Sequence, residues 1–161
     1  MSRASALAAA VLERGRAQGL MVATAESCTG GLVAAALTAV PGSSDVFDRG
    51  WVTYSNLAKR QQLSVPEPLL FEYGAVSEEV VRAMAEGALA ASAAGAAVAV
   101  TGVAGPGGGT PEKPVGLVWF AAARRGGLTH STQERFGDLG RDTVREAATE
   151  TALRLLLEAL A

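Results

Sequence analysis

The residue types best suited to chemistry are concentrated in one octapeptide, Thr-Ala-Glu-Ser-Cys-Thr-Gly-Gly at positions 24–31. A short apolar run precedes it and apolar residues at helical spacing follow it, so Ser27 stands where a buried strand turns into a helix. Such a turn exposes a side chain at the carboxyl edge of a sheet, and N–H groups around Thr29, Gly30 and Gly31 could bind an oxyanion. The alternative is a hydroxyl helix cap followed by glycines that permit close packing.

A serine becomes a good nucleophile only when a base takes its proton, and the composition restricts that base. The chain has one histidine and one cysteine, which disfavours a Ser-His-Asp triad, a histidine metal site and a cysteine-rich zinc site. Lys59 is the better candidate, provided that its pKa falls by about 2–3 units through burial or a neighbouring cation. Tyr54 is close enough in sequence for a relay of Ser27, Tyr54 and Lys59. The alternative for Lys59 is an exposed helix lysine.

A glycine-rich loop at 101–110 is the second candidate element. It follows a small apolar run of the kind found in central strands, and it leaves that strand at the edge where α/β proteins bind ligands. Its N–H groups could form a nest for a phosphate or carboxylate, although Walker and dinucleotide signatures are absent. A flexible surface loop is the alternative. The candidate binding residues in and after this loop are Thr101, Gly102, Gly105, Gly107, Gly108 and Lys113.

Two arginines four residues apart, Arg141 and Arg145, would share one face near the start of the last helix. They could hold a phosphate. Equally, the neighbouring acidic residues could pair with them in an ordinary surface ion-pair cluster. Both interpretations stay open at this point.

Apolar periodicity predicts the elements that must position these residues. Helices are expected over 3–18, from about 31 to 40, from Ser55 or Asn56 to Leu63, as one turn at 69–73, after the capping residue Ser77, and from about 142 to 160. Strands are expected over 20–25, 50–54, 96–101, 115–123 and 128–136, with the last two forming a hairpin. This alternation predicts an α/β class: a single three-layer α/β/α domain over 1–161, with a mixed, mainly parallel sheet that carries an antiparallel hairpin.

Composition excludes several other classes of protein. With 49% hydrophobic and 19% charged residues the chain is globular, and a net charge of −2 gives no reason to expect a nucleic-acid partner. The apolar N-terminal patch is followed at once by charged residues without a convincing cleavage site, so we expect an amphipathic helix and a cytoplasmic protein. The uncharged stretch at 87–111 is broken by Pro106 and glycines, so no membrane span is expected.

Several motifs in order resemble the CinA C-terminal domain family over nearly the whole chain. They are Ala25-Glu26-Ser27-Cys28-Thr29-Gly30-Gly31, Pro41-Gly42-Ser43-Ser44, Gly50-Trp51-Val52-Thr53-Tyr54-Ser55-Asn56, Lys59, Gly74-Ala75-Val76-Ser77, Thr101-Gly102-Val103-Ala104-Gly105-Pro106 and Lys113-Pro114-Val115-Gly116. The resemblance implies hydrolysis of the carboxamide of nicotinamide mononucleotide, which gives nicotinate mononucleotide and ammonia in pyridine-nucleotide salvage. It also implies a homodimer, and neither a cofactor nor a metal is expected.

Carried over by residue, the resemblance implies Ser27 as nucleophile, Lys59 as base and Tyr54 as its assistant, with substrate bound by the loop that starts at Thr101. Whether Lys59 acts directly or through Tyr54 stays open. Two other hypotheses remain. One is a nucleotide-binding or competence-associated partner protein without catalysis, and the other is a cysteine hydrolase that uses Cys28, which we expect instead to be a buried thiol.

Overall fold

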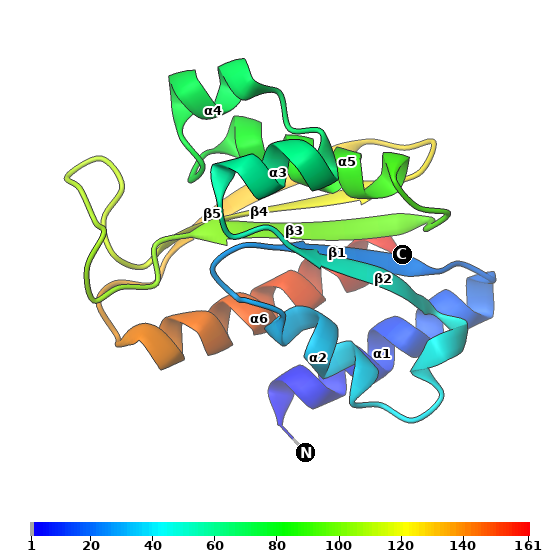
Figure 1. Ribbon diagram of the computed structural model, residues 1–161. Coiled ribbons are helices and arrows are strands. Elements are labelled where there is room, and N and C mark those ends of the chain that lie inside the picture. Colours follow the sequence, from blue (N-terminus) through cyan, green and yellow to red (C-terminus); the bar gives the residue numbers. More distant parts are fainter. Residues whose placement is uncertain (1) are drawn as a thin grey trace.

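The protein is described here by a computed structural model that covers residues 2–161. Within this range a single mixed sheet has the strand order β2-β1-β3-β4-β5 (Figure 1). The strands are β1 (Val22–Glu26), β2 (Phe47–Val52), β3 (Ala96–Gly102), β4 (Leu117–Arg124) and β5 (Thr129–Arg135). Because β2, β1 and β3 pair in parallel and β4 is antiparallel to both β3 and β5, β4 alone runs against the others. The predicted fold class is confirmed.

Helices cover both faces of the sheet (Figure 1). On one face lie α1 (Arg3–Gln18), α2 (Leu32–Thr38) and α6 (Arg141–Ala159), and on the other lie α3 (Asn56–Leu63), α4 (Glu67–Tyr73) and α5 (Glu78–Ala90), with a short 3₁₀ turn at Ser43–Asp45. Within residues 2–161 no helix combines the length and the apolar character that crossing a bilayer requires.

Local sequence signals account for most element boundaries. Ser55 begins α3, since its side chain accepts a hydrogen bond from the Ala58 N–H, and Ser77 caps α5 in the same way. Helix α1 ends at Gly19, whose φ of 65° suits a residue without a Cβ. Strand β2 begins earlier than predicted, because the backbone already pairs with β1 at Phe47.

Side chains along the central strand β3 point alternately into two apolar cores, one on each face of the sheet. In β3, Val98 and Val100 face the core under α1 and α6, whereas Ala97 and Ala99 face α5. The small side chains on the second face let α5 approach the sheet closely.

Gly87 brings α3 into contact with α5. A Cβ at this position would lie 1.9 Å from the carbonyl oxygen of Leu63, the last residue of α3. Only glycine therefore permits this approach, which holds the helix that carries Lys59 against α5.

The strand order reverses between β1 and β3. From β1 the chain passes through α2 to β2 on one side, and it returns through α5 to β3 on the other side of β1. Ligands of α/β proteins bind beyond the carboxyl ends of the strands at such a switch point. Ser27 and the loop from Thr101 both leave the sheet there.

Candidate active site

Ser27 directly follows β1 and lies at the junction predicted from the sequence. Its N–H donates to the Val100 carbonyl oxygen at 2.9 Å, which extends the β1–β3 pairing by one bond. Its Oγ lies 3.0 Å from the Nζ of Lys59, and the residue is 9% exposed. The side chain therefore contacts a lysine, and it is not a helix cap.

Lys59 is fully buried, at 0% exposure, so the alternative of an exposed helix lysine is wrong. Its Nζ donates to the carbonyl oxygens of Thr53 at 2.7 Å and Tyr54 at 3.3 Å. Within residues 2–161 it makes no ion pair, and burial lowers its pKa from 10.5 to about 8. A neutral amine has two N–H groups and one lone pair. In the structure Nζ donates to Ser27 Oγ as well as to the two carbonyl oxygens, which is the pattern of the charged amine. Once the amine loses a proton, the two carbonyl oxygens can keep its two N–H groups, and the lone pair can then accept the proton of Ser27.

Tyr54 contributes to this site through its main chain. Its carbonyl oxygen accepts from Lys59, whereas its hydroxyl accepts from the guanidinium of Arg141 at 2.9 Å and its ring is largely exposed. Within residues 2–161 no hydrogen bond joins the hydroxyl to Ser27 or Lys59. The Tyr54 ring points toward α6. For this reason the predicted relay from Ser27 through the Tyr54 hydroxyl to Lys59 is not formed.

Arg141 and Arg145 do not form the surface ion-pair cluster that the sequence allowed. Among residues 2–161 neither arginine takes part in an ion pair. Arg141 donates to the Gly105 carbonyl oxygen at 2.7 Å, in addition to Tyr54, and so links α6 to the glycine-rich loop. Arg145 donates to the carbonyl oxygens of Cys28 at 3.1 Å and Thr29 at 3.3 Å, so it supports the serine turn from behind.

Glu26 is a buried acid that the sequence interpretation missed. One carboxylate oxygen accepts from the Thr29 hydroxyl at 2.6 Å and from the N–H groups of Gly31 and Val33, and the other accepts from the Ala34 N–H at 3.0 Å. The carboxylate thus accepts hydrogen bonds from N–H groups at the start of α2 that have no acceptor within the helix. The sequence did contain a signal for this role: an acid at the end of an otherwise apolar strand is buried, and a buried carboxylate must accept hydrogen bonds.

Hydrogen bonds within the turn occupy two of the three predicted oxyanion donors, the N–H groups of Gly30 and Gly31. The Gly31 N–H is taken by Glu26, and the Gly30 N–H donates to the Ser27 carbonyl oxygen at 3.0 Å. Neither is free to meet a substrate, and Thr29 is fully buried.

We expect Glu26→Gln to lower the free energy of unfolding by about 1.5–3 kcal/mol, because the amide replaces a charged acceptor and turns its NH₂ toward N–H donors. Urea denaturation measures this loss. Glu112→Gln, at an exposed position in the loop after β3, serves as the control and should leave the midpoint unchanged. Equal stability of the two variants would contradict the role assigned to Glu26.

A cavity of about 310 Å³ lies above Ser27. Its lining joins the serine turn, Tyr54 and Lys59, the segment at Ala75 and Val76, and most of the glycine-rich loop, namely Ser27, Cys28, Tyr54, Lys59, Ala75, Val76, Thr101, Gly102, Val103, Ala104, Gly105, Gly107, Gly108 and Arg141. No carboxylate is among them. Within residues 2–161 the N–H groups of Gly105, Gly107 and Gly108 donate no hydrogen bond. The cavity therefore favours an anionic group.

Of the binding residues predicted in and after the glycine-rich loop, Lys113 lies outside this cavity and the Thr101 side chain is hydrogen-bonded elsewhere. Lys113 donates to the Tyr73 carbonyl oxygen and lines a neighbouring cavity of about 360 Å³. Thr101 is buried, and its hydroxyl donates to the Ala75 carbonyl oxygen at 3.0 Å, which ties the glycine-rich loop to the segment before α5.

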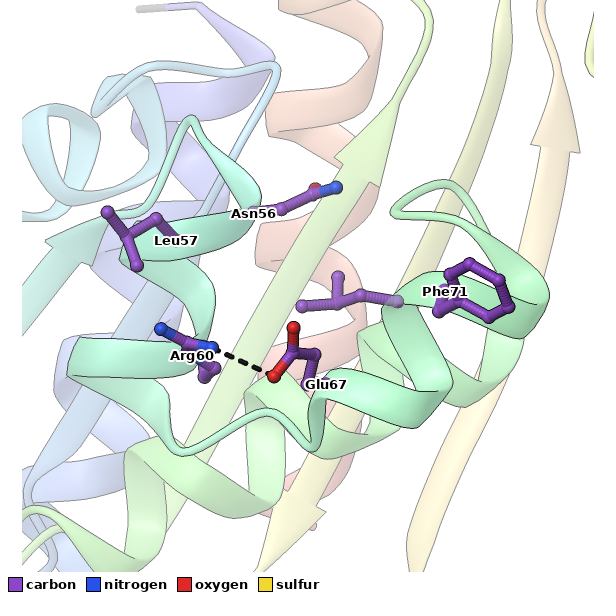
Figure 2. Close-up of a pocket in the computed structure, with 6 residues that line it drawn as sticks. Asn56, Leu57, Arg60, Glu67 and Phe71 are labelled. Atoms are coloured by element: carbon purple, nitrogen blue, oxygen red, sulfur yellow. Dashed lines mark hydrogen bonds and ion pairs between the residues drawn. The ribbon is translucent and has the colours of Figure 1, made fainter.

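A further cavity of about 300 Å³ lies between α3 and α4, where an ion pair of 2.9 Å joins Arg60 and Glu67 (Figure 2). Phe71 and Leu57 at its rim are exposed. It contains none of the candidate catalytic residues. Within residues 2–161 no group of three or more His, Cys, Asp or Glu side chains is arranged to hold a metal ion.

Cys28 is a poor nucleophile in this position. Its side chain is 5% exposed, and burial raises the pKa of the thiol to about 11. The thiol is therefore protonated at neutral pH, which argues against the cysteine-hydrolase hypothesis.

Comparisons with known proteins place most of the chain in one family. Residues 4–160 match the family model described as CinA C-terminal domain. A CinA-like protein of Akkermansia muciniphila is 56% identical over 142 residues, which are 88% of this chain but 34% of that protein. The chain thus spans about a third of the length of the CinA-like relatives it matches.

Shorter relatives and solved structures match over most of both chains. A protein of Escherichia coli named nicotinamide-nucleotide amidohydrolase PncC is 52% identical over 142 residues, covering 88% of this chain and 85% of that one. The crystal structure of the competence/damage inducible protein CihA from Agrobacterium tumefaciens has a TM-score of 0.97 at 50% identity, covering 99% of this chain and 96% of that one.

Proposed function

Because the chain belongs to the CinA C-terminal domain family, we propose that residues 1–161 act as one amidohydrolase domain that converts nicotinamide mononucleotide to nicotinate mononucleotide and ammonia. The observation that carries this proposal is the contact of 3.0 Å between the buried Lys59 amine and Ser27 Oγ at the base of an anion-favouring cavity. The name of the Escherichia coli relative supports the same substrate.

The chemistry proceeds in two steps. Ser27 Oγ bonds to the carboxamide carbon while its proton passes to Lys59, and the carbonyl electron pair moves onto the oxygen. When the C–N bond breaks, Lys59 returns the proton to the leaving nitrogen, which departs as ammonia. Water then adds to the ester, with Lys59 as base again, and releases the carboxylate and free Ser27.

The glycine-rich loop and Arg141 are proposed to bind the 5′-phosphate. The free N–H groups of Gly105, Gly107 and Gly108 would bind phosphate oxygens, and the Arg141 guanidinium already lies beside the loop through its bond to Gly105. A charged group held at this end places the pyridine ring toward Ser27.

Ammonia release from purified protein tests the activity directly. Nicotinamide mononucleotide should be hydrolysed, whereas nicotinamide without ribose and phosphate should be a much poorer substrate. Ligand binding without ammonia release would instead indicate a nucleotide-binding module without catalysis.

Replacing Arg141 should separate binding from chemistry. We expect Arg141→Ala to raise KM for nicotinamide mononucleotide about 10- to 100-fold, the loss typical of a charged hydrogen bond, with kcat changed only a few-fold. Steady-state ammonia assays with the nucleotide and with the nucleoside lacking phosphate measure this effect. The nucleoside should show almost no difference between variant and wild type.

Arg154→Ala serves as the matched control, because Arg154 is an exposed residue of the same helix and pairs with Glu158. An equal rise of KM for nucleotide and nucleoside in Arg141→Ala would contradict phosphate binding by Arg141.

The oligomeric state proposed from the family resemblance is a homodimer. Large apolar side chains on α3 and α4, among them Leu57 and Phe71, are exposed in the single chain and would suit such a contact. Sedimentation equilibrium measures the state directly.

A further inference from the structure

An amide attacked by serine develops negative charge on its carbonyl oxygen, and an enzyme of this kind supplies preorganised donors for it. Of the three donors predicted from the sequence, the N–H groups of Gly30 and Gly31 are occupied by Ser27 and Glu26. The third, Thr29, is buried and does not line the cavity. If the protein has the proposed amidohydrolase activity, other backbone N–H groups must bind the oxyanion.

The first free donor follows the nucleophile. In a trans peptide the C=O and N–H point in opposite directions, and the Ser27 C=O points into the turn toward the Gly30 N–H. The Cys28 N–H therefore points out of the turn. Within residues 2–161 it donates no hydrogen bond, and Cys28 lines the cavity beside Ser27. A donor one residue after the nucleophile is also the arrangement at the serine turn of α/β hydrolases.

The second free donor comes from the neighbouring strand. The Val100 C=O accepts from the Ser27 N–H, so the polar groups of Val100 face β1. Because strand residues alternate, Gly102, two positions further on, also faces the β1 side. If the parallel pairing of β1 and β3 continued past Val100, the Gly102 N–H would donate to the Ser27 carbonyl oxygen. That oxygen instead accepts from the Gly30 N–H.

Gly102 lies opposite Val118 of β4, but it is the next residue, Val103, whose N–H donates to β4, at the Leu117 carbonyl oxygen, so the Gly102 N–H points away from β4. Outside the regular strand and helix pairing no hydrogen bond from this N–H occurs in the described residues, and Gly102 lines the same cavity.

We infer that the oxyanion is bound by the backbone N–H groups of Cys28 and Gly102, one from each of the two strands that flank the switch point. Glu26 and Arg145 act as positioning residues, because Glu26 keeps the α2 N–H groups occupied and Arg145 holds the Cys28 carbonyl. Gly102 must be glycine, since a Cβ there would lie 2.7 Å from Val118 Cγ2 and 2.8 Å from the Leu117 carbonyl oxygen. Substitution would disturb the sheet, so the test must leave the backbone intact.

Selective isotope labelling provides that test. Labelling with ¹⁵N-cysteine gives one backbone amide signal, because Cys28 is the only cysteine. Combining carbonyl-¹³C threonine with ¹⁵N-glycine selects Thr-Gly pairs, of which the sequence has two, Thr29-Gly30 and Thr101-Gly102. The experiment thus observes a proposed donor and an occupied N–H side by side. Thr29→Ser removes the first pair from the spectrum and assigns both signals.

The probe is the analogue of nicotinamide mononucleotide in which an aldehyde replaces the carboxamide. Ser27 Oγ bonds to the aldehyde carbon while its proton passes to Lys59, and the electron pair of the C=O bond moves onto the aldehyde oxygen. That oxygen of the tetrahedral adduct then occupies the position of the oxyanion. The probe is added until ammonia release from the substrate stops. Ser27→Ala is the matched control, because it retains the cavity but cannot form this adduct.

The expected result is a downfield shift of the Cys28 and Gly102 amide protons in the wild type, with Gly30 unchanged and no such shift in Ser27→Ala. A shift of Gly30 with Gly102 unchanged, an unmoved Cys28 signal, or identical shifts in Ser27→Ala would overturn the inference. A protein that releases no ammonia from the substrate would contradict the proposed function itself. An active protein with unmoved Cys28 and Gly102 signals would contradict only the assignment of the donors.

Discussion

Ser27→Ala should abolish ammonia release from nicotinamide mononucleotide, with kcat reduced by about 10⁴- to 10⁶-fold. This is the range found when the serine nucleophile of a hydrolase is removed. The base acts on the attacking oxygen, so it contributes little once that oxygen is gone. The loss should appear in kcat and leave substrate binding largely intact, since the contacts proposed for the phosphate, with the glycine-rich loop and Arg141, do not involve Oγ. Single-turnover ammonia assays with isothermal titration of the substrate separate the two quantities.

The matched control is Ser44→Ala, an exposed serine in the turn after α2 that should retain full activity. Far-ultraviolet circular dichroism and the thermal midpoint establish that Ser27→Ala is folded. Turnover by Ser27→Ala at the wild-type rate would reject the serine mechanism and return Cys28 to consideration as the nucleophile.

Lys59→Met should reduce kcat by about 10²- to 10⁴-fold, the contribution typical of a general base. Methionine fills most of the volume of the buried side chain but cannot take the proton of Ser27. Lys59→Arg should lose at least as much, because a guanidinium stays protonated at every pH at which the protein is folded. Lys113→Met is the matched control, since Lys113 is the other lysine of the chain and lines a different cavity.

The pH dependence of kcat/KM in the wild-type protein should reflect the titration of Lys59. The neutral amine is the reactive form, and burial lowers the pKa of Lys59 to about 8. Below that value kcat/KM should therefore fall about tenfold for each pH unit, and above it the rate should level off. Initial rates from pH 6 to about pH 9.5 measure the profile. A flat profile across this interval, or full activity in Lys59→Met, would contradict Lys59 as the base.

Ser27 and Lys59 could be chosen from the sequence as the candidate catalytic pair because the composition leaves few choices. With one histidine and one cysteine, a serine at a strand-to-helix junction has few partners other than lysine. Ser55 supplied the cap that begins α3, and Lys59 lies on the first turns of that helix. What the sequence did not contain was the exposure of Lys59, because burial depends on how α3 docks on α5 at Gly87.

The arginines and the oxyanion donors show the limit of local patterns. Neighbouring acids made an ion-pair cluster plausible for Arg141 and Arg145, yet both side chains reach carbonyl oxygens far away in sequence. Likewise, Gly30 and Gly31 follow the nucleophile as an oxyanion site would, but a buried carboxylate and a tight turn already occupy their N–H groups.

The sequence by itself determined the fold class and most element boundaries, because periodicity and caps act over a few residues. It also made Ser27 and Lys59 the candidate pair, through composition and the family resemblance. The tertiary structure alone decided three things. It placed Lys59 and Ser27, 32 positions apart, in contact away from water. It turned the Tyr54 hydroxyl toward Arg141. It also set which N–H groups of the serine turn are already hydrogen-bonded, since burial and hydrogen-bond direction follow from how distant strands and helices pack.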